Sequence, residues 1–256
     1  RKNKTMRNMI QDLSGIYREQ TYMKEWAQDY LDGTGLRGTD CYCDPETEKE
    51  LVRQLEKMPA GGIHLMDSGN YHYVSKLFLE TWAGEVSLVV LDHHTDMQPP
   101  ALLPVLSCGS WLLDTLRENP RVRQVFLIGP PQEALDQIPV ECRERLLTIS
   151  QEELGDGSWR EILGTFRTDW PVYVSVDKDV LAPEVCRTNW DQGTMRLEEM
   201  MEILRWFAGG QQIAGVDICG EPDHREALPE ELRQSSRVTR CLADFFDGLD
   251  KREKEG

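Results

Sequence analysis

Acidic residues and histidines follow two apolar stretches of the chain, and within each group they are spaced two residues apart. The apolar stretches cover residues 88–91 and 172–176. The polar residues that follow at this spacing are Asp92, His94, Asp96, Asp177 and Asp179. Alternate side chains of an extended chain point to the same face, so each group presents its polar side chains together. Four carboxylates and one imidazole that converge repel one another unless cations neutralise them, so the pattern predicts a metal site.

Each motif also has a simpler interpretation. An Asp-x-Asp sequence at the end of a strand can cap the helix or loop that follows, without any metal. The Asp92-x-His94-x-Asp96 motif is more specific, because acidic residues seldom end a buried apolar strand without a partner. Two such motifs, at two strand ends of one chain, favour metal binding over capping.

Short apolar segments alternate with amphipathic segments along most of the chain. The segments predicted to be strands cover residues 62–66, 86–91, 122–128, 146–149, 172–176 and 213–218. The segments with helical periodicity cover residues 46–58, 71–82, 110–118, 159–166, 197–207 and 235–249. Most of the strands are apolar at nearly every position, as strands covered on both faces are. The alternation predicts an α/β fold with three layers, in which helices flank a mostly parallel sheet.

We expect a single domain over residues 1–256, because no linker or repeat interrupts this alternation. Residues 1–45 are less regular and are expected to form an N-terminal extension or an edge element, with residues 9–14 as a candidate edge strand. Ligands of open parallel sheets bind in the crevice at the carboxyl ends of the strands. Both acidic motifs lie at such ends, so the expected fold brings them to one rim of the sheet.

Composition limits the classes of partner. The chain has 29 basic and 45 acidic residues, which give a formal net charge of −16. This charge repels nucleic acids and anionic membranes, and it suits a divalent metal or a cationic substrate. The longest apolar runs have four residues, far fewer than the ~20 that a membrane-spanning helix requires. The seven cysteines include no Cys-x-x-Cys pair and are expected to be reduced, which predicts a cytoplasmic protein.

The motifs Asp92-x-His94-x-Asp96 and Ser175-x-Asp177-x-Asp179 resemble the paired motifs of the arginase and agmatinase family, the ureohydrolases, in both order and separation. That family has a third motif, Gly-Gly-Asp-His-Ser, in a loop between a strand and a helix upstream of the first. The corresponding stretch here is Asp67-Ser-Gly-Asn-Tyr-His-Tyr, in which His72 would be the last ligand. The resemblance extends from about residue 61 onward and identifies the chain as a divergent member with the arginase-like fold.

The resemblance implies a binuclear manganese site. Its ligands are the bridging pair Asp92 and Asp177, the pair His72 and Asp96 on one ion, and the pair His94 and Asp179 on the other. Carboxylate-rich sites with some imidazole favour Mn²⁺, with Zn²⁺ and Fe²⁺ as alternatives. Two ions about 3.5–4 Å apart bind a shared water, lower its pKa and hold a bridging hydroxide for attack on an sp² carbon. The implied reaction is hydrolysis of a C–N bond, in which Asp96 also passes a proton toward the departing nitrogen.

Two further family elements differ in this chain. The family's Ser-Gly-Asn-x-His stretch, whose His assists proton transfer, reads Ser107-Cys-Gly-Ser-Trp111 here. Trp111 is a candidate wall for the substrate or else a core residue. His224, in a loop after the last strand, is a candidate catalytic proton shuttle or else an exposed loop histidine. The family's guanidinium-binding Glu corresponds to Gly220, so Glu221 can bind substrate only if the loop is one residue shorter.

We therefore expect a metal-dependent hydrolase that cleaves a C–N bond of a small amidine, guanidino or related compound. One alternative is a single-metal amide deacetylase of the related fold, whose ligands include an Asp-x-His pair; a count of one ion per chain distinguishes it. A second alternative is a non-catalytic metal-binding protein that has lost the substrate pocket. Members of the family often associate, so the resemblance also implies a possible homo-oligomer.

Overall fold

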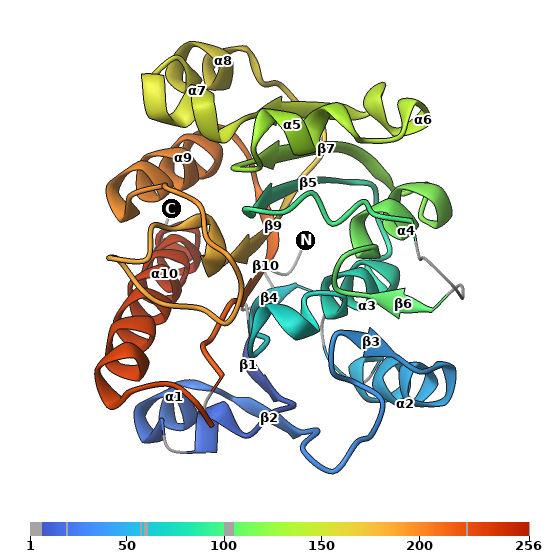
Figure 1. The fold of residues 1–256 in the computed structure, drawn as a ribbon, viewed down its shortest axis with the longest axis vertical. Coiled ribbons are helices and arrows are strands. Elements are labelled where there is room, and N and C mark those ends of the chain that lie inside the picture. The colour runs from blue at the N-terminus through green and yellow to red at the C-terminus, as the bar shows by residue number, and fades with distance from the viewer. Residues whose placement is uncertain are drawn as a thin grey trace.

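A computed structural model of the chain describes residues 7–18, 20–56, 58, 61–99, 105–223 and 225–255. Its central feature is an eight-stranded sheet in the order β2-β1-β4-β10-β9-β5-β7-β8 (Figure 1). All pairings in this sheet are parallel. The strands are β1 (Arg7–Asp12), β2 (Asp29–Asp32), β4 (Gly62–Leu65), β5 (Val86–Leu91), β7 (Val122–Ile128), β8 (Leu146–Ile149), β9 (Val172–Asp177) and β10 (Ile213–Cys219). A separate antiparallel pair joins β3 (Tyr42–Cys43) and β6 (Leu106–Ser107).

Helices cover both faces of the sheet (Figure 1). One face packs against α1 (Thr21–Trp26), α7 (Gln151–Asp156), α8 (Trp159–Thr165), α9 (Leu197–Gly210) and α10 (Pro229–Glu255). The other face packs against α2 (Pro45–Leu55), α3 (Val74–Thr81), α4 (Trp111–Glu118), α5 (Gln132–Asp136) and α6 (Val140–Arg143). Each face has its own apolar core. The predicted three-layer α/β architecture with a parallel sheet is confirmed.

The side chains of β9 illustrate how one strand serves both faces. Val172, Val174 and Val176 belong to the core beneath α8, α9 and α10. Because successive side chains alternate, Ser175 and Asp177 point to the opposite face, which α3 covers. An apolar strand can therefore carry a polar pair on one face while the other face remains in the core.

Local signals determine where several helices begin. Asp44 caps α2 by accepting hydrogen bonds from the backbone amides of Glu46 and Thr47, and Pro45 stands at the first helical position. The short helix α7 begins with a reciprocal capping box between Ser150 and Glu153. These interactions pair amides that a helix would otherwise leave without partners.

The structure differs from the sequence prediction in a few elements. Residues 9–14 were expected to include an edge strand, but β1 lies between β2 and β4, and β2 occupies the end of the sheet. The reason is that Met9 and Ile10 are both buried, one in each core. The helix expected over residues 71–82 is divided into a 3₁₀ turn (Gly69–Tyr71) and α3. The last helix begins at Pro229, earlier than expected. Across the described part of the chain, no helix is long and apolar enough to cross a membrane.

Candidate metal centre

Four adjacent strands of the sheet end at one place (Figure 1). In spatial order they are β4, β10, β9 and β5. The segment after β4 carries His72, the segment after β5 carries residues 92–96, and β9 ends at Asp177. The carboxyl ends of parallel neighbours lie at the same edge of a sheet. The tertiary structure therefore brings together all six residues that the sequence predicts as metal ligands.

The first group is centred on His72. Its Nδ1 atom lies 3.1 Å from Oδ2 of Asp92 and 3.1 Å from Oδ2 of Asp96. The same atom lies 3.6 Å from Oδ2 of Asp177. Asp96 has a left-handed backbone with φ of 50°, a conformation that aspartate tolerates better than most residues. Its carbonyl accepts hydrogen bonds from the backbone amides of Leu112 and Leu113 in the first turn of α4, which fixes its position.

The second group is centred on His94. Its Nδ1 atom lies 3.0 Å from Oδ2 of Asp179 and 3.5 Å from Oδ1 of Asp92. The other nitrogen of the ring, Nε2, lies 3.0 Å from Oδ1 of Asp191. Asp92 thus faces His72 with one oxygen and His94 with the other. Both groups have three side chains whose ligand atoms lie close enough to bind one ion each.

A buried relay orients the ring of His72. Ser175 donates its hydroxyl hydrogen to Oδ1 of Asp217 at 2.5 Å, and the Ser175 oxygen lies 2.9 Å from Nε2 of His72. Since the serine hydrogen is already engaged, Nε2 is the donor in this contact. In the neutral ring, which is the form that binds a metal ion, Nδ1 would then present its lone pair to the carboxylates. A histidine held in this way through its outer nitrogen is typical of metal sites.

The electrostatics of these groups fit a bound cation. His72 Nδ1 and Asp92 Oδ2 are buried, and neither has a hydrogen bond of acceptable geometry among the described residues. Burial, followed by the charge of Asp92, raises the pKa of Asp96 to about 7. Burial also raises the pKa of Asp177 and Asp179 above the usual range of aspartate. Divalent ions would pair the orphaned atoms and allow all the carboxylates to ionise.

The two groups line a cavity of about 410 Å³. Its outer wall includes Tyr42, Cys108 and Trp190. Trp190 is partly exposed, and its ring lies 5.6 Å from the ring of His94. The Trp190 indole donates a hydrogen bond to Asn70, which holds the ring beside the cavity. The site is therefore large enough for a small molecule and has aromatic surface next to the carboxylates.

Two other candidate site residues lie outside the cavity lining, and a third is not among the described residues. Trp111 is fully buried and does not line the cavity; it donates its indole hydrogen to Oδ2 of Asp96 at 2.5 Å. Glu221 is buried against Lys178, with 2.7 Å between the charged atoms, and also accepts hydrogen bonds from hydroxyls of α10. Trp111 thus holds Asp96, a candidate metal ligand, in position. Glu221 pairs with the buried Lys178 and does not line the cavity. His224 lies outside the described residues.

Sequence reasoning did not identify Ser175, Asp217 or Asp191 as parts of the site. For Asp217, the available signal was an acidic residue inside a strand that is otherwise apolar. For Ser175, the available signal was its position two residues before Asp177, which places both side chains on the same face of the strand. Asp191 follows β9 in an irregular segment, and no periodic pattern marks it.

Comparison with known proteins identifies the family. The profile of the arginase family matches residues 50–221, more than half of the chain. The chain belongs to the arginase family. This confirms the resemblance found in the acidic motifs, and it places the protein among hydrolases that act on C–N bonds other than peptide bonds.

Individual relatives of this arginase family member are distant in sequence. A Thermotoga maritima protein described as uncharacterized is 27% identical over 240 residues, which cover 94% of this chain and 90% of that protein. A hypothetical agmatinase from Burkholderia thailandensis has a TM-score of 0.70 at 14% identity, over 100% of this chain and 89% of the other. Proclavaminate amidino hydrolase from Streptomyces clavuligerus has a TM-score of 0.69 at 17% identity, over 97% and 93%. The two structural matches show a shared fold.

Proposed function

We propose that the chain is a divalent-metal-dependent hydrolase that cleaves a C–N bond of a small amidine, guanidino or related compound. One observation supports this proposal above all others: two groups of His and Asp side chains, all buried except the half-buried His94, share Asp92 at the edge of a cavity. Family membership supports the hydrolytic chemistry. The cavity volume of about 410 Å³ suits a small molecule.

We assign one ion to each group, with Asp92 and Asp177 between them. Asp92, His94 and Asp179 offer carboxylate and imidazole donors, which suit Mn²⁺. Bound divalent ions supply Lewis acidity and an activated water. The chain's own residues then orient the reactants: the Ser175 relay holds His72, and the Trp111 indole holds Asp96. Asp96 lines the cavity, which supports the proposal that it passes a proton to the departing nitrogen.

The lining of the cavity supports a cationic or neutral substrate. Among the described residues that form it, none is Lys or Arg, whereas four are aspartates. Gly220 stands where the family places its guanidinium-binding Glu, and a Cβ there would lie 2.4 Å from Oδ1 of Asp177. No side chain fits at that position, which favours a substrate held in a different way from arginine.

Two further parts of the proposal concern the state of the protein. All seven cysteines are free thiols, which supports a reducing compartment such as the cytoplasm. A homo-oligomer is proposed from family resemblance alone, and light scattering coupled to size-exclusion chromatography measures it directly.

Metal analysis followed by a substrate panel tests the function. We expect two divalent ions per chain in protein purified without chelator. At a hundredfold excess over the dissociation constant, Mn²⁺ is expected to stabilise the fold by about 2.7 kcal/mol. The panel contains guanidino, amidine, formimino and acylamine compounds, with released ammonia, urea or amine as the readout. Asp136→Asn is the matched control, because Asp136 is exposed and bonded only to Gln132 and, through its carbonyl, to Arg143.

The outcomes separate the alternatives. Two ions with turnover of a guanidino or amidine compound support the proposal. One ion per chain with turnover of an acylamine supports the deacetylase alternative. Two ions without turnover of any compound in the panel support a non-catalytic metal-binding protein. A chain that binds no more metal than the buffer blank rules out all three.

A further inference from the structure

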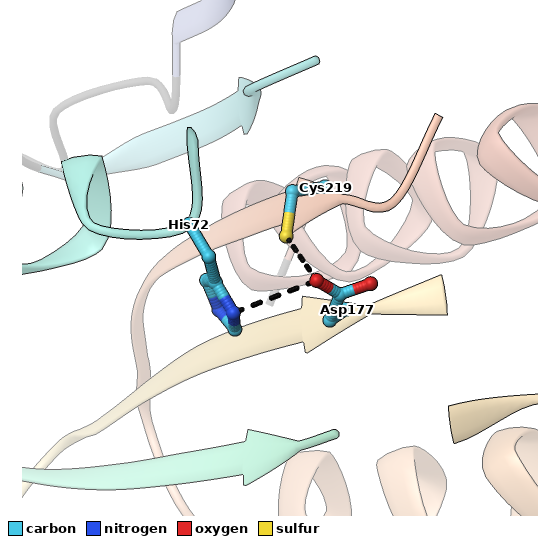
Figure 2. Close-up of side chains that lie close together, drawn as sticks. All are labelled: His72, Asp177 and Cys219. Atoms are coloured by element: carbon cyan, nitrogen blue, oxygen red, sulfur yellow. Dashed lines mark hydrogen bonds and ion pairs between the residues drawn. The ribbon is translucent and has the colours of Figure 1, made fainter. Parts of the chain in front are cut away.

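A cysteine lies beside the proposed ligands and has no role in the function proposed above. Cys219 is the last residue of β10, and its register partner on β9 is Asp177. Its side chain is fully buried. Because side chains alternate along β10, Cys219 points to the same face as Asp217, the face from which His72 approaches. Figure 2 shows that the thiol and the imidazole both approach the same oxygen of the Asp177 carboxylate.

The three side chains lie close enough together to share an ion. Sγ of Cys219 lies 3.1 Å from Oδ2 of Asp177, and the same oxygen lies 3.6 Å from Nδ1 of His72. The three ligand atoms all lie within 4.8 Å of one another. Sulfur, nitrogen and oxygen atoms bound to one tetrahedral ion are separated by roughly 3.3–3.7 Å, as metal–ligand distances of about 2.0–2.3 Å require.

His72 supplies an independent observation. Its Nδ1 atom is buried without an acceptable hydrogen bond among the described residues, although the ring is 1% exposed. The opposite nitrogen is held by Ser175, so the ring is not free to turn Nδ1 elsewhere. Nδ1 is therefore aimed at a point that Asp177 and Cys219 also face.

Two glycines, Gly69 and Gly220, allow the chain to approach Asp177 and the end of β9 closely. A Cβ at Gly69 would lie 2.9 Å from Oδ2 of Asp177, the oxygen shared with Cys219. A Cβ at Gly220 would lie 2.6 Å from the backbone nitrogen of Lys178. The chain can therefore bring the end of β10 directly against β9, which sets the position of the Cys219 side chain.

A simpler interpretation is available. A buried cysteine is ordinarily a small apolar residue and a weak hydrogen-bond donor, and Cys219 can donate to Asp177 in that role. Coordination differs because the ligand is a thiolate. The thiol loses its proton to solvent when the ion binds. Thiolate donors select Zn²⁺ and Fe²⁺ over Mn²⁺, since they are softer than carboxylate or imidazole.

We propose that Cys219 is a thiolate ligand of the ion held by His72 and Asp177, and that its sulfur makes this position selective for Zn²⁺ or Fe²⁺ over Mn²⁺. The position formed by Asp92, His94 and Asp179 has no sulfur donor and keeps its preference for Mn²⁺. The inference rests on the proposed metal centre, but it does not depend on the proposed reaction.

Cobalt substitution tests the sulfur ligand without any assay of activity. Apoprotein titrated with Co²⁺ is expected to develop the near-ultraviolet charge-transfer absorption of a cobalt–thiolate bond. Cys219→Ser is expected to lose this absorption while it still binds Co²⁺ through oxygen and nitrogen. Cys142→Ser is the matched control, because Cys142 is buried in α6 outside the cavity lining, and it should keep the absorption. In competition titrations, Cys219→Ser should weaken Zn²⁺ binding by about tenfold or more, and Mn²⁺ binding by less.

Cadmium NMR of the wild-type protein makes the same test if the variant does not fold, because a thiolate ligand shifts the cadmium resonance strongly downfield. Metal bound stoichiometrically without the cobalt absorption or the cadmium shift would overturn this inference and leave the proposed function standing. A failure to bind any divalent ion would overturn both. Bound metal with the sulfur signature but no turnover would uphold the ligand and count against the proposed reaction.

Discussion

Oδ2 of Asp92 lies 3.1 Å from Nδ1 of His72, yet both atoms are buried and neither completes a hydrogen bond of acceptable geometry among the described residues. Buried polar atoms are nearly always paired, because an unpaired one has lost its water without compensation. The proposed cation, which would contact both atoms, would account for the exception at this pair. Asp92 also faces His94 with its other oxygen, so it connects the two proposed ion positions.

Removal of the shared carboxylate is expected to weaken metal binding at both positions. Asp92→Asn keeps the shape of the side chain but removes the charge that attracts two divalent ions. We expect the variant to retain fewer than two ions per chain and to lose about a hundredfold or more in metal affinity. Elemental analysis after gel filtration measures the content. Retention of two ions by Asp92→Asn, as in the Asp136→Asn control, would contradict the assignment.

The relay behind His72 is expected to affect metal affinity more than folding. Ser175→Ala removes the contact that fixes Nε2, so the ring is no longer held with Nδ1 toward the carboxylates. We expect metal affinity to fall about 10–100-fold, which isothermal titration calorimetry measures. Ser87→Ala is a matched control, since Ser87 is also buried in a central strand but bonds to Thr168. Equal affinities in the two variants would refute the relay.

The backbone at Gly220 is expected to be intolerant of any side chain. Its φ of 87° and the 2.4 Å approach to Asp177 act together, whereas Gly157 has a φ of 84° and no neighbour within 4 Å. Gly157→Ala should therefore cost only the left-handed strain of about 1–2 kcal/mol. Gly220→Ala should cost more than this in urea unfolding and should also weaken metal binding. An equal loss of unfolding free energy in the two variants would show that the structure can relieve the contact with Asp177 at no cost.

The pair formed by Lys178 and Glu221 is expected to stabilise the fold and not to bind substrate. Burial alone would raise the pKa of Glu221, but Lys178 outweighs it and holds the pKa below its ordinary value. Glu221→Gln leaves a buried lysine without its partner, so we expect a loss of about 3–5 kcal/mol in the free energy of unfolding. The double variant Lys178→Met with Glu221→Leu should recover much of it.

The same pair predicts a dependence on pH. A carboxyl whose pKa is lower in the folded state stabilises the fold above its unfolded pKa, and this stabilisation is lost as the pH falls through the folded pKa. The stability of Glu221→Gln should therefore fall less steeply in acid than that of the wild-type protein, as measured by urea unfolding at a series of pH values. A Glu221→Gln variant that is as stable as the wild-type protein but binds a substrate more weakly would instead support a role of Glu221 in substrate binding.

Several features of this protein could be predicted from its sequence because they depend on neighbours along the chain. The apolar runs identified β5, β7, β8, β9 and β10 closely, since a strand buried on both faces must be apolar at most positions. The two-residue spacing placed Asp92, His94 and Asp96 on one side for the same local reason. Short elements such as α5 and α6 were not predicted, because four or five residues give too little of a helical period.

Other features depend on which strands lie side by side, and this order is not encoded in any local pattern. The adjacency of β9 and β10 brings Cys219 to Asp177 and Asp217 to Ser175, pairs separated by 42 positions in the chain. The same adjacency brings Glu221 to Lys178 and away from the cavity, because burial of one charge requires an opposite charge beside it. The sequence alone therefore determined which His and Asp residues could bind metal, through their types and spacing. Only the tertiary structure decided which donors lie close enough to share an ion, because coordination depends on distances of a few ångströms between segments that are remote in the chain.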